Sequence, residues 1–168
     1  DAQISFDGLV VANLDQVIKA IEKARNRLAA SDSDPYKALD RTAILNAAMG
    51  AYHMKAIIAK RSGRAAEWLA AIQQEFQAVR DAGRDPRSQW WLYLESYRPL
   101  ISLDRLEESR DILERCIAFF RGSGDTKGVA HANLGLAEVL MREGDAVRAE
   151  VMMERVLGSI VDRRDPEL

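Results

Sequence analysis

The chain has little of what disulfide-bonded proteins and many catalytic sites require. Among its 168 residues there are two histidines and a single cysteine, Cys116, which excludes an internal disulfide. A chain without disulfides fits a reducing compartment, so we expect a cytoplasmic protein. Four prolines and ten glycines are few beside the abundant alanine and leucine. This composition favours helices over sheets.

Neither sign of charge dominates, and long apolar runs are missing. The 24 Lys and Arg are interleaved with 26 Asp and Glu, for a net charge of −2. Nucleic-acid binders carry clustered cations that displace counterions, so we expect neither nucleic acid nor an anionic membrane as partner. The longest apolar runs, such as residues 8–12, fall far short of the roughly 20 residues of a membrane-spanning helix.

The chain begins at Asp1 without an initiator methionine, and we therefore expect a fragment or a processed form.

Sequence signatures of catalysis are also missing. The chain has no glycine-rich phosphate loop, no paired cysteines, no His-Glu-x-x-His and no nucleophile elbow. His53 and His131 are isolated from each other and from Cys116, which favours groove or surface residues over metal ligands. Cys116 is expected to be a buried, inert thiol. The sequence therefore predicts no enzyme, no cofactor and no metal site.

What the sequence does contain is an internal repeat, marked first by helix starts. Asp-Pro occurs at residues 34–35, 85–86 and 165–166, and Asp125-Thr126 lies midway between the last two, giving steps of 51, 40 and 40 residues. An Asp at the N-cap accepts hydrogen bonds from the first free amides and complements the helix dipole. Proline at the first helical position loses no hydrogen bond. The pattern predicts four helix starts.

A second series of turn residues has the same step. Gly63, Asp104 and Gly144 are 41 and 40 residues apart, midway between the helix starts. Each residue tolerates the left-handed backbone that ends one helix before the next begins. Two interlocking series predict a repeated helix–turn–helix unit of about 40 residues.

When the three units are aligned at this step, positions that face the core should be apolar in every unit. We call each set of equivalent apolar positions a column. The columns expected in the core are Ala56, Tyr97 and Ala137; Ala59, Leu100 and Leu140; Ile72, Leu113 and Met153; Phe76, Ile117 and Leu157; and Val79, Phe120 and Ile160.

The last unit resembles a tetratricopeptide repeat. The matching positions are Leu136-Ala137, Leu140, Gly144-Asp145, Ala149 and Met153. Residues 124–135 are similar to the 40-residue variety of that repeat, found in STAND and LuxR-type regulators and in Pins-type scaffolds. The resemblance covers residues 36–165 and weakens toward the N-terminus. It implies an all-α, right-handed superhelical array of antiparallel helix pairs, with about 3.5 units.

We therefore expect a single helical-repeat domain over residues 1–168. Its parts are an unassigned lead-in (1–12), a half-unit (13–34) with a helix at 13–30, repeat units at 35–84, 85–124 and 125–164, and the start of a further unit (165–168). A long helix is expected over 36–60. Because repeat arrays bury each unit against the next, we expect the parent protein to continue past Leu168.

Three residues depart from the repeat pattern. Trp68 and Ser109 stand where the last unit has Ala149, and we expect Trp68 to wedge its two helices apart. Pro99 interrupts a first helix, where it removes the hydrogen bond to the Glu95 carbonyl and should kink the helix.

The resemblance also implies that the first helix of each unit lines a concave binding surface. Helical geometry then gives the candidate partner-binding residues His53, Lys60, Arg61, Trp91, Leu94, Arg98, His131, Glu138 and Arg142, with Ile57, Ser102 and Leu134 on the same side. For Trp91, an exposed anchor and a packing residue are equally open interpretations, whereas Trp90, in line with Met49, is expected in the core.

These residues favour a protein- or peptide-binding module, as a regulatory or sensor segment of a larger signalling protein. Lys60, Arg98 and Arg142 favour an acidic segment as ligand. The alternative is a small-molecule effector-sensing domain of a transcriptional regulator, which a closed apolar pocket would support. Self-association through the repeat ends is a third hypothesis.

Overall fold

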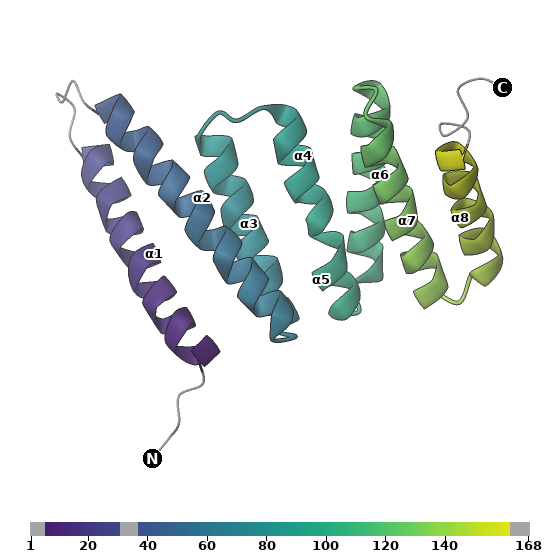
Figure 1. Cartoon of the computed structure of the whole chain (residues 1–168), viewed down its shortest axis with the longest axis horizontal. Coiled ribbons are helices and arrows are strands. Elements are labelled where there is room, and N and C mark those ends of the chain that lie inside the picture. Colours follow the sequence, from purple (N-terminus) through teal and green to yellow (C-terminus); the bar gives the residue numbers. More distant parts are fainter. Residues whose placement is uncertain (1–5, 31–36, 162–168) are drawn as a thin grey trace, which may run out of the picture. The chain divides into compact units, whose positions relative to one another are not determined.

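The structure, a computed structural model, describes residues 6–30 and 37–161, and all regular secondary structure within these ranges is helical (Figure 1). The helices are α1 (Phe6–Ala30), α2 (Lys37–Arg61), α3 (Ala65–Asp81), α4 (Pro86–Glu95), α5 (Tyr97–Ser102), α6 (Leu106–Gly122), α7 (Thr126–Arg142) and α8 (Ala146–Val161). The all-α prediction is thus confirmed for the described ranges. The right-handed superhelical arrangement stays a prediction.

The marked helix starts agree with the structure where it describes them. A carboxylate oxygen of Asp85 accepts the Ser88 N–H at 3.3 Å, and one of Asp125 accepts the Gly128 N–H at 3.0 Å. Asp34-Pro35 and Asp165-Pro166 lie outside the described residues. The helix expected over 36–60 is α2, and the helix expected over 13–30 is α1, which begins earlier, at Phe6, within the segment left unassigned.

Five turns in the described chain share one backbone form. Their central residues all have a positive φ, between 58° and 84°: Gly63, Gly83, Asp104, Gly124 and Gly144. In each turn the N–H of the following residue donates to the carbonyl five residues before it, over 2.8–3.2 Å. This is the hydrogen bond of a Schellman motif, which satisfies a free carbonyl at the helix end. The three expected turns are confirmed, and the same form recurs between them at Gly83 and Gly124.

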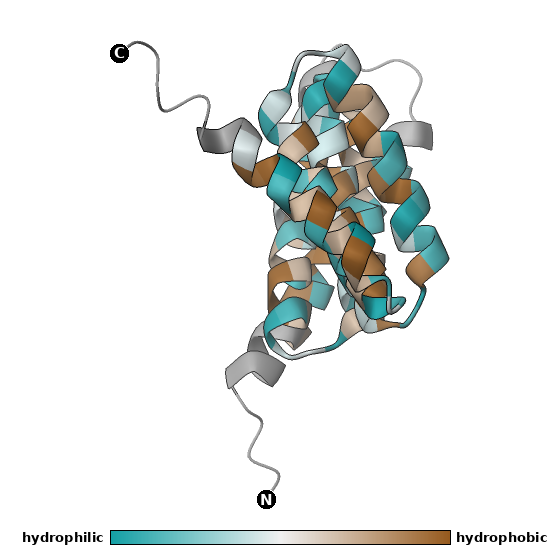
Figure 2. Cartoon of the chain, turned by 90° about the vertical axis from the view of Figure 1, so that its right-hand side faces the viewer, coloured by the Kyte–Doolittle hydropathy of each residue, from teal (hydrophilic) through white to brown (hydrophobic). Residues whose placement is uncertain are grey.

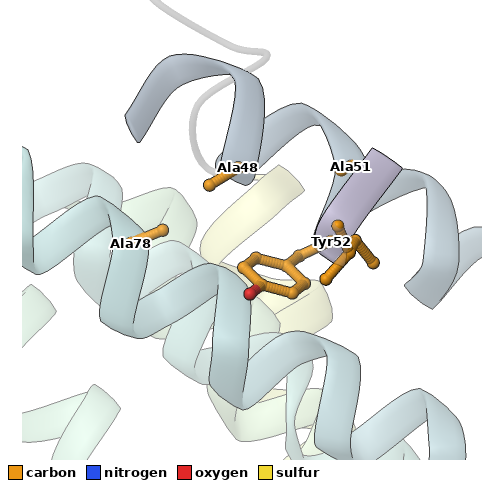
Figure 3. Close-up of a cluster of buried hydrophobic side chains, with 5 residues drawn as sticks. Ala48, Ala51, Tyr52 and Ala78 are labelled. Carbon is orange, nitrogen blue, oxygen red and sulfur yellow. The ribbon is translucent and has the colours of Figure 1, made fainter. Parts of the chain in front are cut away.

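The backbone divides into two compact units, Asp1–Gln89 and Trp90–Leu168, which are described separately. In the first unit α2 packs against both α1 and α3. Its core joins Ile18 of α1, Ala48, Ala51 and Tyr52 of α2, and Ala78 of α3; Figure 3 shows four of these residues labelled. Alanine at these positions leaves room for the Tyr52 ring, whose hydroxyl lies 3.4 Å from a carboxylate oxygen of Glu22.

Trp68 does not separate its two helices, so the expected wedge is wrong. The α2–α3 pair makes the most extensive contact of any helix pair in the described residues. Ala59 and Ala71 are fully buried, whereas the indole of Trp68 is half-buried. The ammonium of Lys60 lies 5.2 Å from the centroid of the indole. The large ring is therefore accommodated at the edge of the pair, where a cation packs on it.

The expected kink at Pro99 is confirmed in the second unit. Helix α4 ends at Glu95 and α5 begins at Tyr97, with the Ser96 N–H donating to the Tyr93 carbonyl at 3.1 Å in a tighter turn. Because Pro99 has no N–H, the Glu95 carbonyl loses its helical partner.

Side chains of α6 lie directly against two glycines of α7, Gly128 and Gly135, seven residues apart. A Cβ atom on Gly128 would lie 2.4 Å from Cγ of the fully buried Phe120 ring. A Cβ atom on Gly135 would lie 2.6 Å from a methyl carbon of Leu113 and 3.1 Å from the Tyr97 ring. The side chains of α6 thus fill the space that glycine leaves on α7.

The two columns of the first helices are buried as expected: Ala56, Tyr97 and Ala137, and Ala59, Leu100 and Leu140. In the second-helix columns, Ile72, Leu113 and Phe120 are buried as well. Met153 and Leu157 are 36% and 60% exposed, so their placement in the core is wrong. The buried positions of α8 are instead Ala149 and Val156, with the half-buried Met152. Leu113 packs against the helix that follows it, and within the described chain no helix follows α8. The side chain of Ile160 lies outside the described residues.

Figure 2, which views the chain from the α8 side, shows apolar segments alternating with polar ones along this helix. Val147 and Val151 are 73% and 44% exposed there. The exposed apolar side chains of α8 thus include Val147 and Val151 as well as Met153 and Leu157.

The glycine contacts give a test of the α6–α7 packing. Gly128→Ala and Gly135→Ala should each destabilise the protein by about 1–3 kcal/mol, because the added methyl group overpacks a close contact. Gly50→Ala, on an open face of α2 with nothing near the new methyl group, should stabilise it by about 0.5–1 kcal/mol. Urea unfolding followed by circular dichroism measures all three variants. Equal effects at Gly50 and Gly128 would contradict the close approach.

Candidate binding surfaces

The predicted site residues divide between the two units. His53, Lys60 and Arg61 belong to the first unit, and Trp91, Leu94, Arg98, His131, Glu138 and Arg142 belong to the second. All of them are exposed except Trp91, which is half-buried, and Leu94, which is buried.

In the first unit two of the three candidates already pair with a side chain of α3. His53 Nδ1 lies 3.1 Å from a carboxylate oxygen of Glu75. Lys60 packs over the Trp68 ring. These contacts hold the two side chains against the α2–α3 pair.

In the second unit the structure brings Trp91 and His131 together, with ring centroids 5.4 Å apart. Trp91 also lies 5.2 Å from the Phe120 ring, and its indole N–H donates to Asp125 Oδ2 at 3.1 Å. Both the ring and the polar end of Trp91 therefore have partners within the unit. These contacts favour the interpretation of Trp91 as a packing residue over that of an exposed binding anchor. Trp90 is likewise half-buried, stacked on Phe119 at 4.8 Å.

Leu94 does not lie on an accessible surface. Its side chain is 2% exposed, so its expected place among the partner-binding residues is wrong. Leu94, Tyr97 and Ile101 are all buried and follow one another at spacings of three and four residues. On a helix this spacing defines one face, and here that face is turned into the core.

One face of α7 carries most of the remaining candidates. We call this set the α7 stripe: His131, Leu134, Glu138, Met141 and Arg142, all exposed and spaced along one side of the helix. Leu134 and Met141, seven residues apart, are 43% and 54% exposed. The sequence analysis missed Met141, although its spacing of seven from Leu134 was a usable signal.

Arg98, on α5, is held in place by contacts with the neighbouring Tyr97. Its Nε donates to the Tyr97 hydroxyl at 2.9 Å, and its guanidinium lies 5.6 Å from the Tyr97 ring centroid. The hydrogen bond to Tyr97, together with the nearby carboxylates of Glu95 and Glu138, raises the pKa of Arg98. Glu138, which belongs to the α7 stripe, makes the smallest of these contributions to the pKa of Arg98.

Two pockets that the sequence did not predict lie between α6 and α8. The larger, of about 410 Å³, we call the Arg121–Arg155 pocket. It is lined by Phe120, Arg121, Gly124, Thr126, Val129, Ala130, Asn133, Met152, Arg155 and Val156. The second, of about 370 Å³, shares Met152 and Arg155 with it and extends toward Arg110 and Val147. On α7, Val129, Asn133, Leu136 and Leu140 face these pockets, on the side of the helix opposite the α7 stripe.

The charges differ between the two pockets. Arg121 and Arg155 are exposed, and neither forms an ion pair with any described residue. In the second pocket Arg110 pairs with Glu143 and Arg148 with Asp145. The Arg148 backbone N–H, followed by its guanidinium, lowers the pKa of Asp145. Among the described residues, the lining of the Arg121–Arg155 pocket contains no carboxylate, whereas Glu114 lines the second pocket together with Arg155.

Cys116 is buried, as expected. Its side chain is 0% exposed, and its sulfur lies 4.0 Å from the Trp90 carbonyl oxygen. Burial raises the pKa of the thiol to about 12, because the thiolate would lose its hydration. Among the described residues, no three His, Cys, Asp or Glu side chains gather closely enough to hold a metal ion.

Comparison of the chain with protein-family models, with curated proteins and with solved structures gave no match. The tetratricopeptide resemblance therefore stays a prediction. Within the described ranges, no helix combines the length and the apolar character that crossing a bilayer requires.

The burial of Cys116 predicts an unreactive thiol. In the native protein at pH 8, an aromatic disulfide reagent should modify Cys116 at least about a hundredfold more slowly than in the urea-unfolded chain, because the attacking species is the thiolate. Absorbance at 412 nm follows the reaction. Native and unfolded rates within a factor of about three would contradict the burial.

A second prediction concerns the link between Trp91 and the start of α7. Asp125→Ala should destabilise the protein by about 1–3 kcal/mol, because it removes a buried helix cap and the acceptor of the Trp91 N–H. Asp145→Ala removes the cap of α8, which is only half-buried and accepts the Arg148 N–H, and it should cost less. Thermal unfolding followed by tryptophan fluorescence compares the stability of the two variants. A greater loss of stability for Asp145→Ala than for Asp125→Ala would refute the role of Asp125 as a buried cap and acceptor.

Proposed function

We propose that the chain is a protein- or peptide-binding module whose second unit engages its partner through the α7 stripe. The observation that carries this proposal is the exposure of Leu134 and Met141, 43% and 54%, on one helix face. Each burial of such a side chain by a partner removes apolar surface from water. A pair seven residues apart matches the spacing at which an extended or helical segment can contact one helix face.

Charges beside the two apolar side chains favour an acidic segment. Arg98 and Arg142 are exposed cations on α5 and α7, against the single acid Glu138 of the stripe. Complementary charge speeds encounter and fixes the register of a bound segment, while the apolar contacts contribute more of the affinity. The first unit carries a separate set of exposed candidates: His53, Lys60 and Arg61. The proposed binding of a partner to the α7 stripe does not depend on them.

A regulatory or sensor segment of a larger signalling protein is the setting we propose for this module. The support is the resemblance of residues 36–165 to tetratricopeptide repeats of the kind found in such proteins. A separate observation bears on the small-molecule alternative: the Arg121–Arg155 pocket has an apolar floor, but its two arginines are exposed, so it is more open than the closed pocket expected for that function.

Peptide selection tests the proposal. A displayed library of random twelve-residue peptides is selected against the full chain, and the recovered peptides are measured by fluorescence anisotropy. We expect peptides in which apolar residues are flanked by Asp or Glu. The double variant Leu134→Gln, Met141→Gln should weaken their binding at least about tenfold, which corresponds to about 1.4 kcal/mol.

Two further variants sharpen this experiment. Arg98→Glu with Arg142→Glu should weaken acidic peptides more at low salt than at high salt. Val17→Gln, which removes an apolar side chain 49% exposed on α1, should leave the affinity unchanged. Peptides that bind the glutamine double variant as tightly as the wild type would exclude the α7 stripe as the site.

A further inference from the structure

We propose that the Arg121–Arg155 pocket binds a small amphipathic carboxylate, a molecule with an apolar body and one carboxylate group. The pocket lies on the side of α7 opposite the α7 stripe, so this site is distinct from the one proposed above for a peptide and goes beyond that function.

The dimensions of the pocket fit a small molecule. Its volume of about 410 Å³ falls within the range of about 300–1,000 Å³ typical of ligand pockets. The pocket is bounded by three helices, since Phe120 comes from α6, Val129 from α7 and Met152 from α8. The neighbouring pocket of about 370 Å³ shares Met152 and Arg155, which gives an elongated apolar body room to continue.

The floor of the pocket is apolar. Phe120 and Val156 are buried, and Val129 and Met152 are half-buried. Such a floor gives no hydrogen bonds to a fully hydrated anion, whereas an alkyl or aryl group on it removes apolar surface from water. Inorganic anions are therefore poor ligands for this pocket, and an apolar body is required.

The polar groups of the pocket select the charge of the ligand. Arg121 at the end of α6 and Arg155 on α8 are the charged side chains among the described residues of its lining, and none of those residues carries a carboxylate. In a chain with a net charge of −2, two guanidinium groups without an ion pair to any described residue mark a local excess of positive charge. A guanidinium matches a carboxylate with two parallel hydrogen bonds. Thr126 and Asn133 add a hydroxyl and an amide for the ligand's remaining polar atoms.

The first experiment uses octanoate and 1-octanol as probes of equal chain length. Isothermal titration calorimetry on the full chain should show saturable binding of octanoate at one site. The double variant Arg121→Gln, Arg155→Gln should weaken octanoate at least about tenfold, or about 1.4 kcal/mol, and leave 1-octanol within about twofold of wild type. Raising the salt from about 0.05 M to about 0.5 M should weaken octanoate and not 1-octanol.

Three controls make the result specific. Arg115→Gln removes an exposed α6 cation that pairs with Asp111 and lines neither pocket, and it should leave octanoate binding unchanged. Ala130→Phe places a ring in the pocket and should abolish binding of both probes. Leu134→Gln with Met141→Gln should not affect octanoate, which separates this site from the α7 stripe. Thermal unfolding identifies any variant that has lost its fold.

Several outcomes would overturn the proposal. Absence of saturable octanoate binding to the wild type would do so, as would equal binding by Arg115→Gln and the double variant. Displacement of octanoate by inorganic phosphate at equal concentration would indicate a plain anion site. Saturable binding of the peptide acetyl-Leu-Glu-Leu-Glu-amide in this pocket, without binding of octanoate, would replace the small-molecule assignment by a peptide.

Discussion

A backbone hydrogen bond that closes each left-handed turn determines where the helices of this protein end and begin. It joins the residue after the positive-φ position to the carbonyl five residues earlier, and it recurs from Arg64 to Asp145. At Arg64, Arg105, Asp125 and Asp145 the donor also directly precedes the next helix, so that ending one helix fixes the start of the following one. The faces that α7 presents, and with them both candidate surfaces, depend on this register.

Within the second unit, Trp91 connects the two candidate surfaces of α7. Its ring contacts His131, which belongs to the α7 stripe, and Phe120, which forms the floor of the Arg121–Arg155 pocket. Its N–H donates to Asp125, whose carboxylate also caps α7. A residue that the sequence suggested as a binding anchor is thus explained by packing and by a buried hydrogen bond. Of the candidate partner-binding residues in the second unit, the exposed ones are Arg98 and those on α7.

Local features could be predicted from the sequence, and features that depend on distances between helices could not. Helix caps such as Asp125, the turn at Gly63 and the kink at Pro99 follow from backbone chemistry within a few residues. Leu94 was placed on an accessible face although it lies three residues before Tyr97, which the apolar columns placed in the core, so its burial could have been predicted from helical spacing. Met153 was placed in the core because its equivalent Leu113 packs against the following helix α7, and Leu157 was placed there with it by the same helical spacing. The pockets depend on the separation of α6 and α8, which no spacing in the sequence records.

The order in which the helices pack has a consequence for the way the chain folds. Most helix contacts in the described residues join neighbours in the sequence; the exceptions include α5 with α7 and the contacts of Trp90 and Trp91, on α4, with α6 and α7. Such a topology has a low contact order, and a chain with low contact order closes only short loops on its way to the native state. Helix pairs can therefore form early and independently, and the search for distant partners that slows β-sheet proteins is largely avoided here.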